Sequence, residues 1–202
     1  MNINILATLH GHMDHVLFVT GNPGPALGVL QSLIQDGDTF SAVAIGGDKL
    51  DDMLKTCTSA GASGIYRLMD EGFMGSDTWA LARIYAAFVG KYSPDAETFI
   101  FARHSSAMPM LAHLIRAQQF CYVTEIVRDA EGIVATQDYG DERRICRVPR
   151  GSVISLKDDL QIPFERKSAR TPDVKILGRE DIELAERSVG FCGSRVLARE
   201  VC

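Results

Sequence analysis

The sequence predicts an α/β fold with a mostly parallel sheet that antiparallel strands complete. Up to about residue 117, short apolar runs rich in β-branched residues alternate with segments whose apolar residues recur every three or four positions. That alternation is typical of strand–helix–strand units and parallel pairing. From Phe120 to Leu156 only short apolar runs separated by turn signals follow. Such a run of strands favours an antiparallel meander at one side of the sheet.

The first elements are recognised by their apolar runs and by the breakers between them. Ile3–Leu9 and Val16–Thr20 are short, apolar and partly β-branched, which predicts two strands. Residues 21–25 contain glycine, asparagine and proline and break the pattern. From Ala26 leucines recur at helical spacing until the Asp-Gly-Asp at 36–38. This spacing predicts one amphipathic helix.

Three further pairs of strand and helix follow. Phe40–Ile45 predicts a strand, and a helix capped by Asp48 is expected to run through Cys57. Gly64–Leu68 predicts the next strand, and a loop at 69–76 separates it from a helix over Asp77–Val89. The remaining predictions are a strand at Thr98–Phe101, a helix at Met108–Ala117, strands at Cys121–Val127, Ile133–Gln137, Arg144–Val148 and Ser152–Leu156, and a last helix from Glu180 to about Arg187.

The pattern of elements also predicts how the chain divides. Residues 1–156 contain the predicted sheet, and we expect them to form one domain. Residues 157–172 are polar and irregular, so residues 157–202 are expected to be a C-terminal extension with a short helix. Gly190 and Gly193 are expected to break that helix.

Composition excludes several classes of protein. The chain has 202 residues, 46% of them hydrophobic, and a formal charge of −5. These values exclude a disordered chain and disfavour a nucleic-acid-binding protein, which needs an excess of basic residues on one face. The five cysteines are widely spaced and form no CxxC pair, so we expect free thiols and no structural zinc. We found no signal peptide and no membrane-spanning run, and we expect a cytoplasmic protein with no membrane insertion.

One segment carries ligands typical of metal sites. His10, His12, Asp14 and His15 follow the H-x-H-x-D-H pattern of metal-dependent hydrolases, in which such side chains bind metal and activate water. The pattern needs further histidines downstream, and the chain offers only His104 and His113. A metal-dependent hydrolase therefore stays a remote alternative, and we expect a polar loop here with no bound metal.

Three other segments follow strands and begin helices. Gly46 and its neighbour Gly47 end one strand, where phosphates approach the backbone in doubly wound folds. Asp77 and Thr78 open a helix, either as a cap or with N–H groups and hydroxyls available to a phosphate. Ala102–Ser106 follows another strand and offers an arginine and two serines. No GxGxxG, P-loop or GxSxG motif is present, so no catalytic nucleophile is predicted.

The order of these segments resembles the β subunit family of electron transfer flavoproteins. The resemblance runs from the first strand to about Leu156. The matching motifs, in order, are Asn22-Pro23 with Ala26-Leu27, Val43-Ala44-Ile45-Gly46-Gly47, Ala60-Gly61-Ala62, Gly75-Ser76-Asp77-Thr78, Pro109-Met110-Leu111-Ala112, Val123-Thr124, and the Gly turn with Glu142-Arg143 that leads to Val148-Pro149.

The resemblance implies a fold, a partner and cofactors. The expected fold is a Rossmann-like, three-layer α/β/α domain. The expected cofactors are FAD, shared with an α-type subunit, and either AMP or, as in the electron-bifurcating members of the family, a second FAD. The expected role is relay of electrons between a dehydrogenase and an acceptor, with no catalytic group in this chain. The residues that match nucleotide contacts by position are Thr8, Asn22, Ile45, Gly46, Asp77, Thr78, Ala102, Arg103, His104, Ser105 and Ser106.

Two departures from the family pattern leave an alternative open. The family's second threonine after Asp-Thr is Leu81 here, and the loop Ala102–Ser106 is shorter than in the family. Losing a hydroxyl that contacts a phosphate removes about 1 kcal/mol. A binding or scaffolding module of the same fold that has lost its nucleotide is the alternative that these departures favour.

Overall fold

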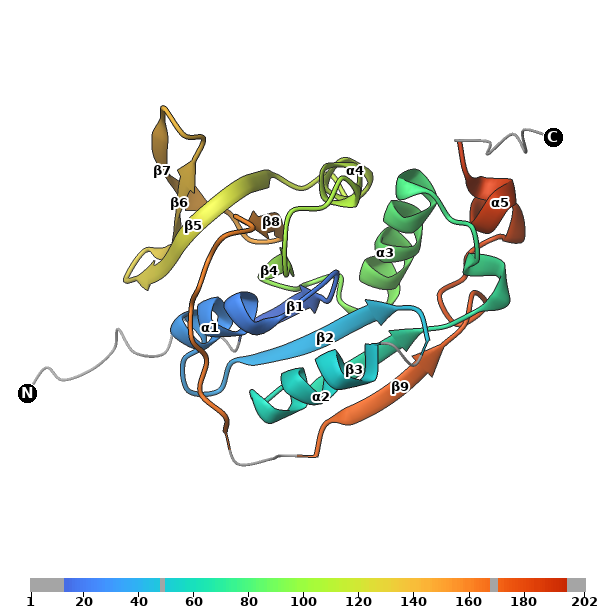
Figure 1. The fold of residues 1–202 in the computed structure, drawn as a ribbon, viewed down its shortest axis with the longest axis horizontal. Coiled ribbons are helices and arrows are strands. Elements are labelled where there is room, and N and C mark those ends of the chain that lie inside the picture. Colours follow the sequence, from blue (N-terminus) through green and yellow to red (C-terminus); the bar gives the residue numbers. More distant parts are fainter. Residues whose placement is uncertain (1–12, 48–49, 168–170, 196–202) are drawn as a thin grey trace, which may run out of the picture.

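The sheet runs through the whole molecule with nine strands in the order β7-β6-β5-β8-β4-β1-β2-β3-β9 (Figure 1). The computed structural model describes residues 13–47, 50–167 and 171–195. All pairings from β9 through β1 to β5 are parallel, and β6 pairs antiparallel with both β5 and β7. The strands are β1 (Asp14–Phe18), β2 (Thr39–Ile45), β3 (Gly64–Leu68), β4 (Thr98–Phe101), β5 (Gln119–Asp129), β6 (Gly132–Asp138), β7 (Arg143–Val148), β8 (Ser152–Leu156) and β9 (Asp173–Leu177).

Helices cover both faces of this sheet and produce three layers. The longer helices are α1 (Gly24–Leu33), α2 (Asp51–Ser59), α3 (Thr78–Tyr92) and α4 (Ala107–Leu114), and three short turns of helix are η3 (Glu71–Phe73), η4 (Glu186–Ser188) and α5 (Gly190–Gly193). Leu17 of β1 packs in one core cluster with α1 and α2, whereas its neighbour Phe18 packs in a second cluster with α3 and α4. Successive residues of a strand point to opposite faces, so β1 contributes to both cores. The predicted α/β class with a mostly parallel sheet is confirmed.

Most predicted elements of the described residues are present. The strands Gly64–Leu68, Thr98–Phe101 and Ser152–Leu156 have the predicted bounds, and the helix predicted to begin at Asp77 begins at Thr78 with Asp77 as its N-cap. The predicted strand Ile3–Leu9 and the predicted cap Asp48 lie outside the described residues. The described sheet therefore has β1 as its first strand.

The predicted four-stranded meander is wrong in its last strand. β5, β6 and β7 form a meander, but β8 lies between β4 and β5 and is parallel to both. The turn at Gly151, whose φ is +76°, returns the chain to the sheet, and the N–H of Val153 donates to the carbonyl of Gln118 at 2.8 Å. β8 therefore extends the parallel part of the sheet.

The predicted helix from Glu180 to Arg187 is also wrong. Glu183 has a φ of 55°, a left-handed conformation that an α-helix cannot contain, and Asp181 accepts the N–H of Gly178 at 2.7 Å to form a local turn. Gly190 and Gly193, expected as breakers, instead bound the short helix α5. Before this turn, Asp173–Leu177 forms the unpredicted edge strand β9, which pairs with β3.

A long connection joins β8 to β9 across the outside of α1. Figure 1 shows it as the orange segment that passes α1 on its way to β9. The side-chain amide of Gln31 donates to the carbonyl of Glu165 and accepts its N–H, each at 2.7 Å. Gly28 permits the approach, because a Cβ there would lie 2.5 Å from the side chain of Ile162. We call residues 160–167 the strap.

Candidate functional site

Two loops leave the same edge of the sheet at β1 and β4. β1 pairs in parallel with β2 on one side and with β4 on the other. The helix after β1 packs on one face, and the helix after β4 packs on the opposite face. In open parallel sheets, ligands bind in the crevice at the carboxyl ends of strands whose connections diverge in this way. This edge is the candidate site.

The loop after β1 brings a threonine, a glycine and an asparagine to the edge. Asn22 folds back so that its Oδ1 accepts the N–H of Gly24 at 3.1 Å, at the start of α1. The Oγ1 atom of Thr20 is buried and has no hydrogen-bond partner among the described residues. A Cβ on Gly21 would lie 2.6 Å from the Cδ of Arg103. Glycine at position 21 therefore allows the arginine of the second loop to cross the first.

The loop after β4 places a histidine against an aromatic side chain. The N–H of His104 donates to Oδ1 of Asp158, in the loop after β8, at 3.1 Å. The His104 ring stacks on Tyr122 with the ring centroids 5.0 Å apart and 15° between the planes. The Nδ1 atom of His104 is buried, and the structure shows no partner for it within the described part of the chain. The imidazole that stacks on Tyr122 thus carries a buried nitrogen for which no hydrogen-bond partner occurs among the described residues.

The serine side chains of this loop make few hydrogen bonds to the described residues. Oγ of Ser105 accepts the N–H of Ala107 at 3.3 Å, while Ser106 precedes α4 without a side-chain cap. Arg103 is exposed, and no hydrogen bond or ion pair to its guanidinium occurs among the described residues. A guanidinium in this position can bind an anionic oxygen.

Tyr122 reaches the site because β5 is irregular there. Its φ is 54°, and the register of β5 against both β6 and β8 shifts around it. A bulge of this kind re-aims a side chain. Tyr122 also contacts Tyr139 edge-on, with the centroids 5.8 Å apart, and the guanidinium of Arg144 lies 5.5 Å from the Tyr139 ring. The rings of His104, Tyr122 and Tyr139 therefore form a row from the loop after β4, across β5, to the residue that follows β6.

A cleft of about 660 Å3 opens at the ends of β2 and β3. Its lining is mainly apolar and includes two glycines without side chains to fill it. The lining residues are Ile45, Gly46, Gly47, Leu68, Met69, Asp70, Glu71, Phe73 and Met74. Both oxygens of Asp70 are already used, because they accept the N–H groups of Gly72 at 2.7 Å and Arg179 at 2.8 Å. Hydrogen bonding, led by the Arg179 N–H, lowers the pKa of Asp70.

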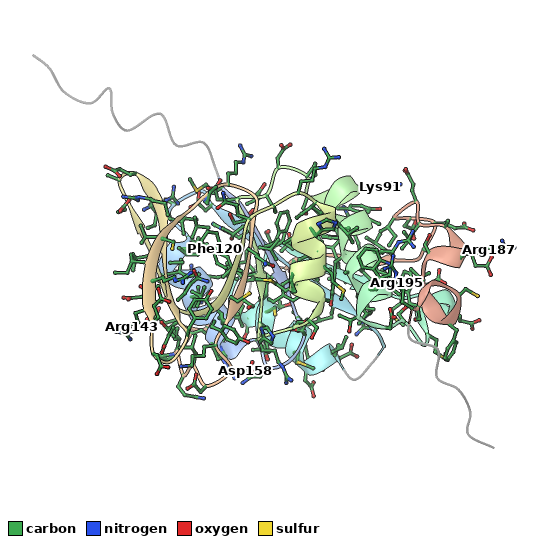
Figure 2. All side chains as sticks on the ribbon, turned by 90° about the horizontal axis from the view of Figure 1, so that it is seen from above. Lys91, Phe120, Arg143, Asp158, Arg187 and Arg195 are labelled. Atoms are coloured by element: carbon green, nitrogen blue, oxygen red, sulfur yellow. The ribbon has the colours of Figure 1, made fainter. Side chains whose placement is uncertain are left out.

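The start of α3 is bonded within the chain. Asp77 accepts the N–H of Ala80 at 2.9 Å through Oδ1 and that of Arg195 at 2.6 Å through Oδ2. Its own N–H donates to Oγ of Ser194 at 2.9 Å. Figure 2 shows Arg195 beside α3, on the C-terminal segment. Asp77 is thus a cap, while Thr78 is the first residue of the helix.

The histidine-rich segment does not assemble a metal site in the described residues. His10 and His12 lie outside them. Asp14 is exposed at the start of β1 and accepts a hydrogen bond from Thr39, whereas His15 is buried and its Nδ1 lies 2.8 Å from the hydroxyl oxygen of Thr98. No group of three potential metal ligands occurs in residues 13–47, 50–167 and 171–195. Adjacent strand residues point to opposite faces, so Asp14 and His15 diverge.

The carboxyl edge fits a nucleotide. The apolar cleft at the ends of β2 and β3 suits a planar ring system. The unpartnered Oγ1 of Thr20 and Nδ1 of His104 lie in the loops after β1 and β4, outside the lining of that cleft. The exposed guanidinium of Arg103 suits a phosphate. FAD and AMP both combine a ring system with phosphate groups, so the donor set is compatible with either.

Comparisons with known proteins decide the family. The model of the electron transfer flavoprotein domain matches residues 31–181, which is more than half of the chain. The chain belongs to the electron transfer flavoprotein family. The electron transfer flavoprotein subunit beta of Thermoanaerobacterium thermosaccharolyticum is 22% identical over 170 residues, covering 78% of this chain. The chain spans 65% of the length of that curated relative.

Membership of the electron transfer flavoprotein family confirms the resemblance, and the structure shows how its motifs are arranged. Ile45 ends β2, and Asn22, Gly46 and the loop Ala102–Ser106 follow parallel strands, so all of them lie along the carboxyl edge. Asp77 and Thr78 open α3, which begins after the loop that lines the cleft. Thr8 lies outside the described residues.

Sequence reasoning did not assign Thr20, Gly21, Tyr122 or Asp158 to the site. Thr20 and Gly21 sit between an apolar run and a helix, a position that could have identified them. Tyr122 joins the site only through its left-handed φ, and Asp158 through the parallel placement of β8. Neither feature has a local sequence signal.

Among the described residues, no helix combines the length and the apolar content needed to cross a membrane.

Proposed function

We propose that the chain is a β-type electron transfer flavoprotein subunit that pairs with an α-type subunit. In this complex, located in the cytoplasm, it helps to hold FAD, takes AMP at its own carboxyl edge, and relays electrons between a dehydrogenase and an acceptor. The observation that carries the proposal is the match of the family model to residues 31–181, which include most of the candidate site. FAD, when bound, supplies the electron-accepting ring chemistry.

In this proposal the residues of the chain bind and orient the nucleotides. The apolar side chains Ile45, Leu68 and Phe73 exclude water from one side of a bound ring system. Arg103 supplies positive charge for a phosphate, and His104 is held in place by Asp158 on one side and by Tyr122 on the other. The chain needs no catalytic acid, base or nucleophile for this role.

Co-expression with an α-type electron transfer flavoprotein subunit from the same organism tests this proposal. We expect a stable yellow complex whose flavin absorbance persists through gel filtration. The Arg103→Gln variant should retain less nucleotide, whereas the matched control Arg147→Gln, on the distant strand β7, should retain as much as the unsubstituted complex. A colourless mixture without association would contradict the proposal.

A second candidate function is a binding module of the same fold that holds no nucleotide. Two observations favour it: Leu81 packs against the core where the family pattern has a hydroxyl, and the start of α3 is bonded to Ser194 and Arg195. Calorimetry with AMP, ADP, ATP and FAD separates the two candidates. Binding at micromolar concentration would exclude the nucleotide-free module, and no heat with any of the four would support it.

A further inference from the structure

The C-terminal segment is built onto the loop that forms the far wall of the cleft. We call residues 186–195 the latch; they contain η4 and α5. Residues 69–74 line the cleft apart from one glycine at position 72, and the latch contacts the same loop through residues 72–77. One stretch of chain therefore faces the cleft and holds the latch.

Besides the bond from the Arg195 N–H to Oδ2 of Asp77, hydrogen bonds fix the latch at two further points. The N–H of Gly190 donates to Oγ of Ser76 at 2.8 Å. Oγ of Ser194 accepts the N–H of Asp77 at 2.9 Å, and its one proton is shared between the carbonyls of Gly190 at 2.7 Å and Gly75 at 2.9 Å. The loop's polar backbone groups at positions 75 and 77 thus find partners in the latch.

Close packing makes the contact specific. Gly190 has a φ of +60°, and a Cβ there would lie 2.4 Å from the carbonyl oxygen of Gly72 and 3.0 Å from that of Met74. The ring of Phe191 lies over Gly75, where a Cβ would come within 2.5 Å of ring atoms. Phe191 is nevertheless 70% exposed. Two glycines, one on each side of the contact, permit the approach.

The latch also meets the first turns of α3. The guanidinium of Arg195 lies 4.6 Å from the ring of Trp79, the only tryptophan of the chain, and Arg83 donates to Oγ of Ser188 at 2.8 Å. The latch therefore contacts both the part of the loop beside the cleft, at Gly72 and Met74, and the helix α3 that follows the loop. Apart from Phe73, which is buried, that loop buries few apolar side chains of its own.

From these contacts we propose that docking of the latch sets the wall of the cleft, so that latch closure and ligand occupancy of the cleft favour each other. A loop that the latch has already ordered loses less conformational freedom when a ligand binds against it. The coupling is reciprocal, so a ligand in the cleft must also shift the equilibrium of the latch towards its docked position. The choice of AMP and FAD as ligands rests on the proposed function.

The test opens the latch with a single methyl group. Gly190→Ala places a Cβ against two carbonyl oxygens and strains the backbone, so the latch should detach while the sheet stays folded. Gly151→Ala is the matched control, because Gly151 also has a positive φ but no atom lies within 4 Å of its added Cβ. Ser194→Ala is a milder second variant that removes the hydroxyl bonds and keeps the backbone unstrained.

Two measurements report on the latch, and a third reports on nucleotide binding. In Gly190→Ala, with the full chain and its α-type subunit, the emission of Trp79 should shift and amide exchange at residues 69–77 should accelerate. The affinity for AMP and FAD should fall on the order of tenfold, within the range typical of coupled sites. Gly151→Ala should leave all three unchanged, and Ser194→Ala should give values between those of Gly151→Ala and Gly190→Ala.

The outcomes distinguish the inference from the proposed function. Unchanged exchange at residues 69–77 in Gly190→Ala overturns the inference whatever the nucleotides do. A detached latch with unchanged or tighter nucleotide binding also overturns it, while leaving the proposed function intact. If the unsubstituted complex binds neither AMP nor FAD, the proposed function and the ligand coupling both fail.

Discussion

At the scale of single residues, the most unusual group is His15 in the middle of the sheet. Its side chain is 1% exposed, Nδ1 meets the hydroxyl of Thr98, and Nε2 has no partner in the described residues. The pKa of His15 is lowered to about 4, mainly because burial disfavours the charged imidazolium. The negative charges of Asp38 and Asp14 oppose this shift, and the positive charge of Arg128 adds to it.

This lowered pKa predicts acid sensitivity. Between about pH 6.5 and pH 4 the unfolded chain binds a proton at His15 and the folded chain does not. The free energy of unfolding should therefore fall as the pH falls through this window. The loss amounts to about 3 kcal/mol over the window. Thermal unfolding of the wild type and of His15→Asn from pH 7.5 to 4.5 tests it. The variant, which retains a polar group near Thr98, should lose this slope; an unchanged slope would contradict the assignment.

A buried ion pair lies nearby and predicts a large mutational effect. Arg128 and Asp38 are 2.5 Å apart with side chains 5% and 4% exposed, and Asp38 also accepts the N–H groups of Met13 and Gln35. Asp38→Ala leaves a buried guanidinium without its partner and should cost about 3–5 kcal/mol in denaturant unfolding. Asp52→Ala breaks the exposed pair with Lys55 and should produce no measurable change. Equal effects of the two substitutions would show that burial of the first pair is not decisive.

At the scale of elements, α1 is held from outside by the strap. Gly28→Ala adds a Cβ that would meet Ile162 and the carbonyl of Pro163 at 2.5 and 2.7 Å, so it should destabilise the fold and expose residues 160–167 to proteolysis. Gly90→Ala, in α3 with no atom within 4 Å of the added Cβ, should stabilise it by about 0.5–1 kcal/mol. The same chemical change is thus expected to have opposite signs in two helices. A stabilising Gly28→Ala would mean that the strap does not pack closely.

The elements that sequence predicted well are those with a strong apolar period. The buried leucines of α1 and the fully buried run of β4 leave little choice of structure. β9 was missed although its charged and aliphatic residues alternate as in a strand, because the segment is only five residues long and four of them are exposed. The residues of the candidate site were predictable as loops after strands. Their grouping was not, since the stack of His104 on Tyr122 depends on a bulge and on the position of β8.

At the scale of the whole molecule, the sheet ends in two exposed edges. β7 carries Ile145, 75% exposed, and β9 carries Val174 and Ile176, 61% and 64% exposed. Edge strands with aliphatic side chains invite pairing between molecules. The edges are therefore where self-association of the isolated chain is expected to begin.

Substitution at an edge tests this expectation. Ile145→Glu places an acid on the same face of β7 as Arg143 and Arg147, so it should change stability by less than about 0.5 kcal/mol and reduce light scattering at high concentration. Ile133→Val, at a buried position of the neighbouring strand, should cost about 0.5–1.5 kcal/mol and leave scattering of the folded chain unchanged. Scattering that is insensitive to Ile145→Glu would place self-association elsewhere.

The pairing of β9 with β3 also has a consequence for synthesis on the ribosome. β3 ends at Leu68, but its outer neighbour begins only at Asp173, after the strands of the opposite side have been made. At roughly 5–20 residues per second, translation of the intervening hundred or so residues leaves the hydrogen-bonding edge of β3 uncovered for roughly 5–20 s. During that time a nascent chain presents an open strand to chaperones and to other nascent chains. The last strand of the sheet therefore also determines how long the growing protein must be protected.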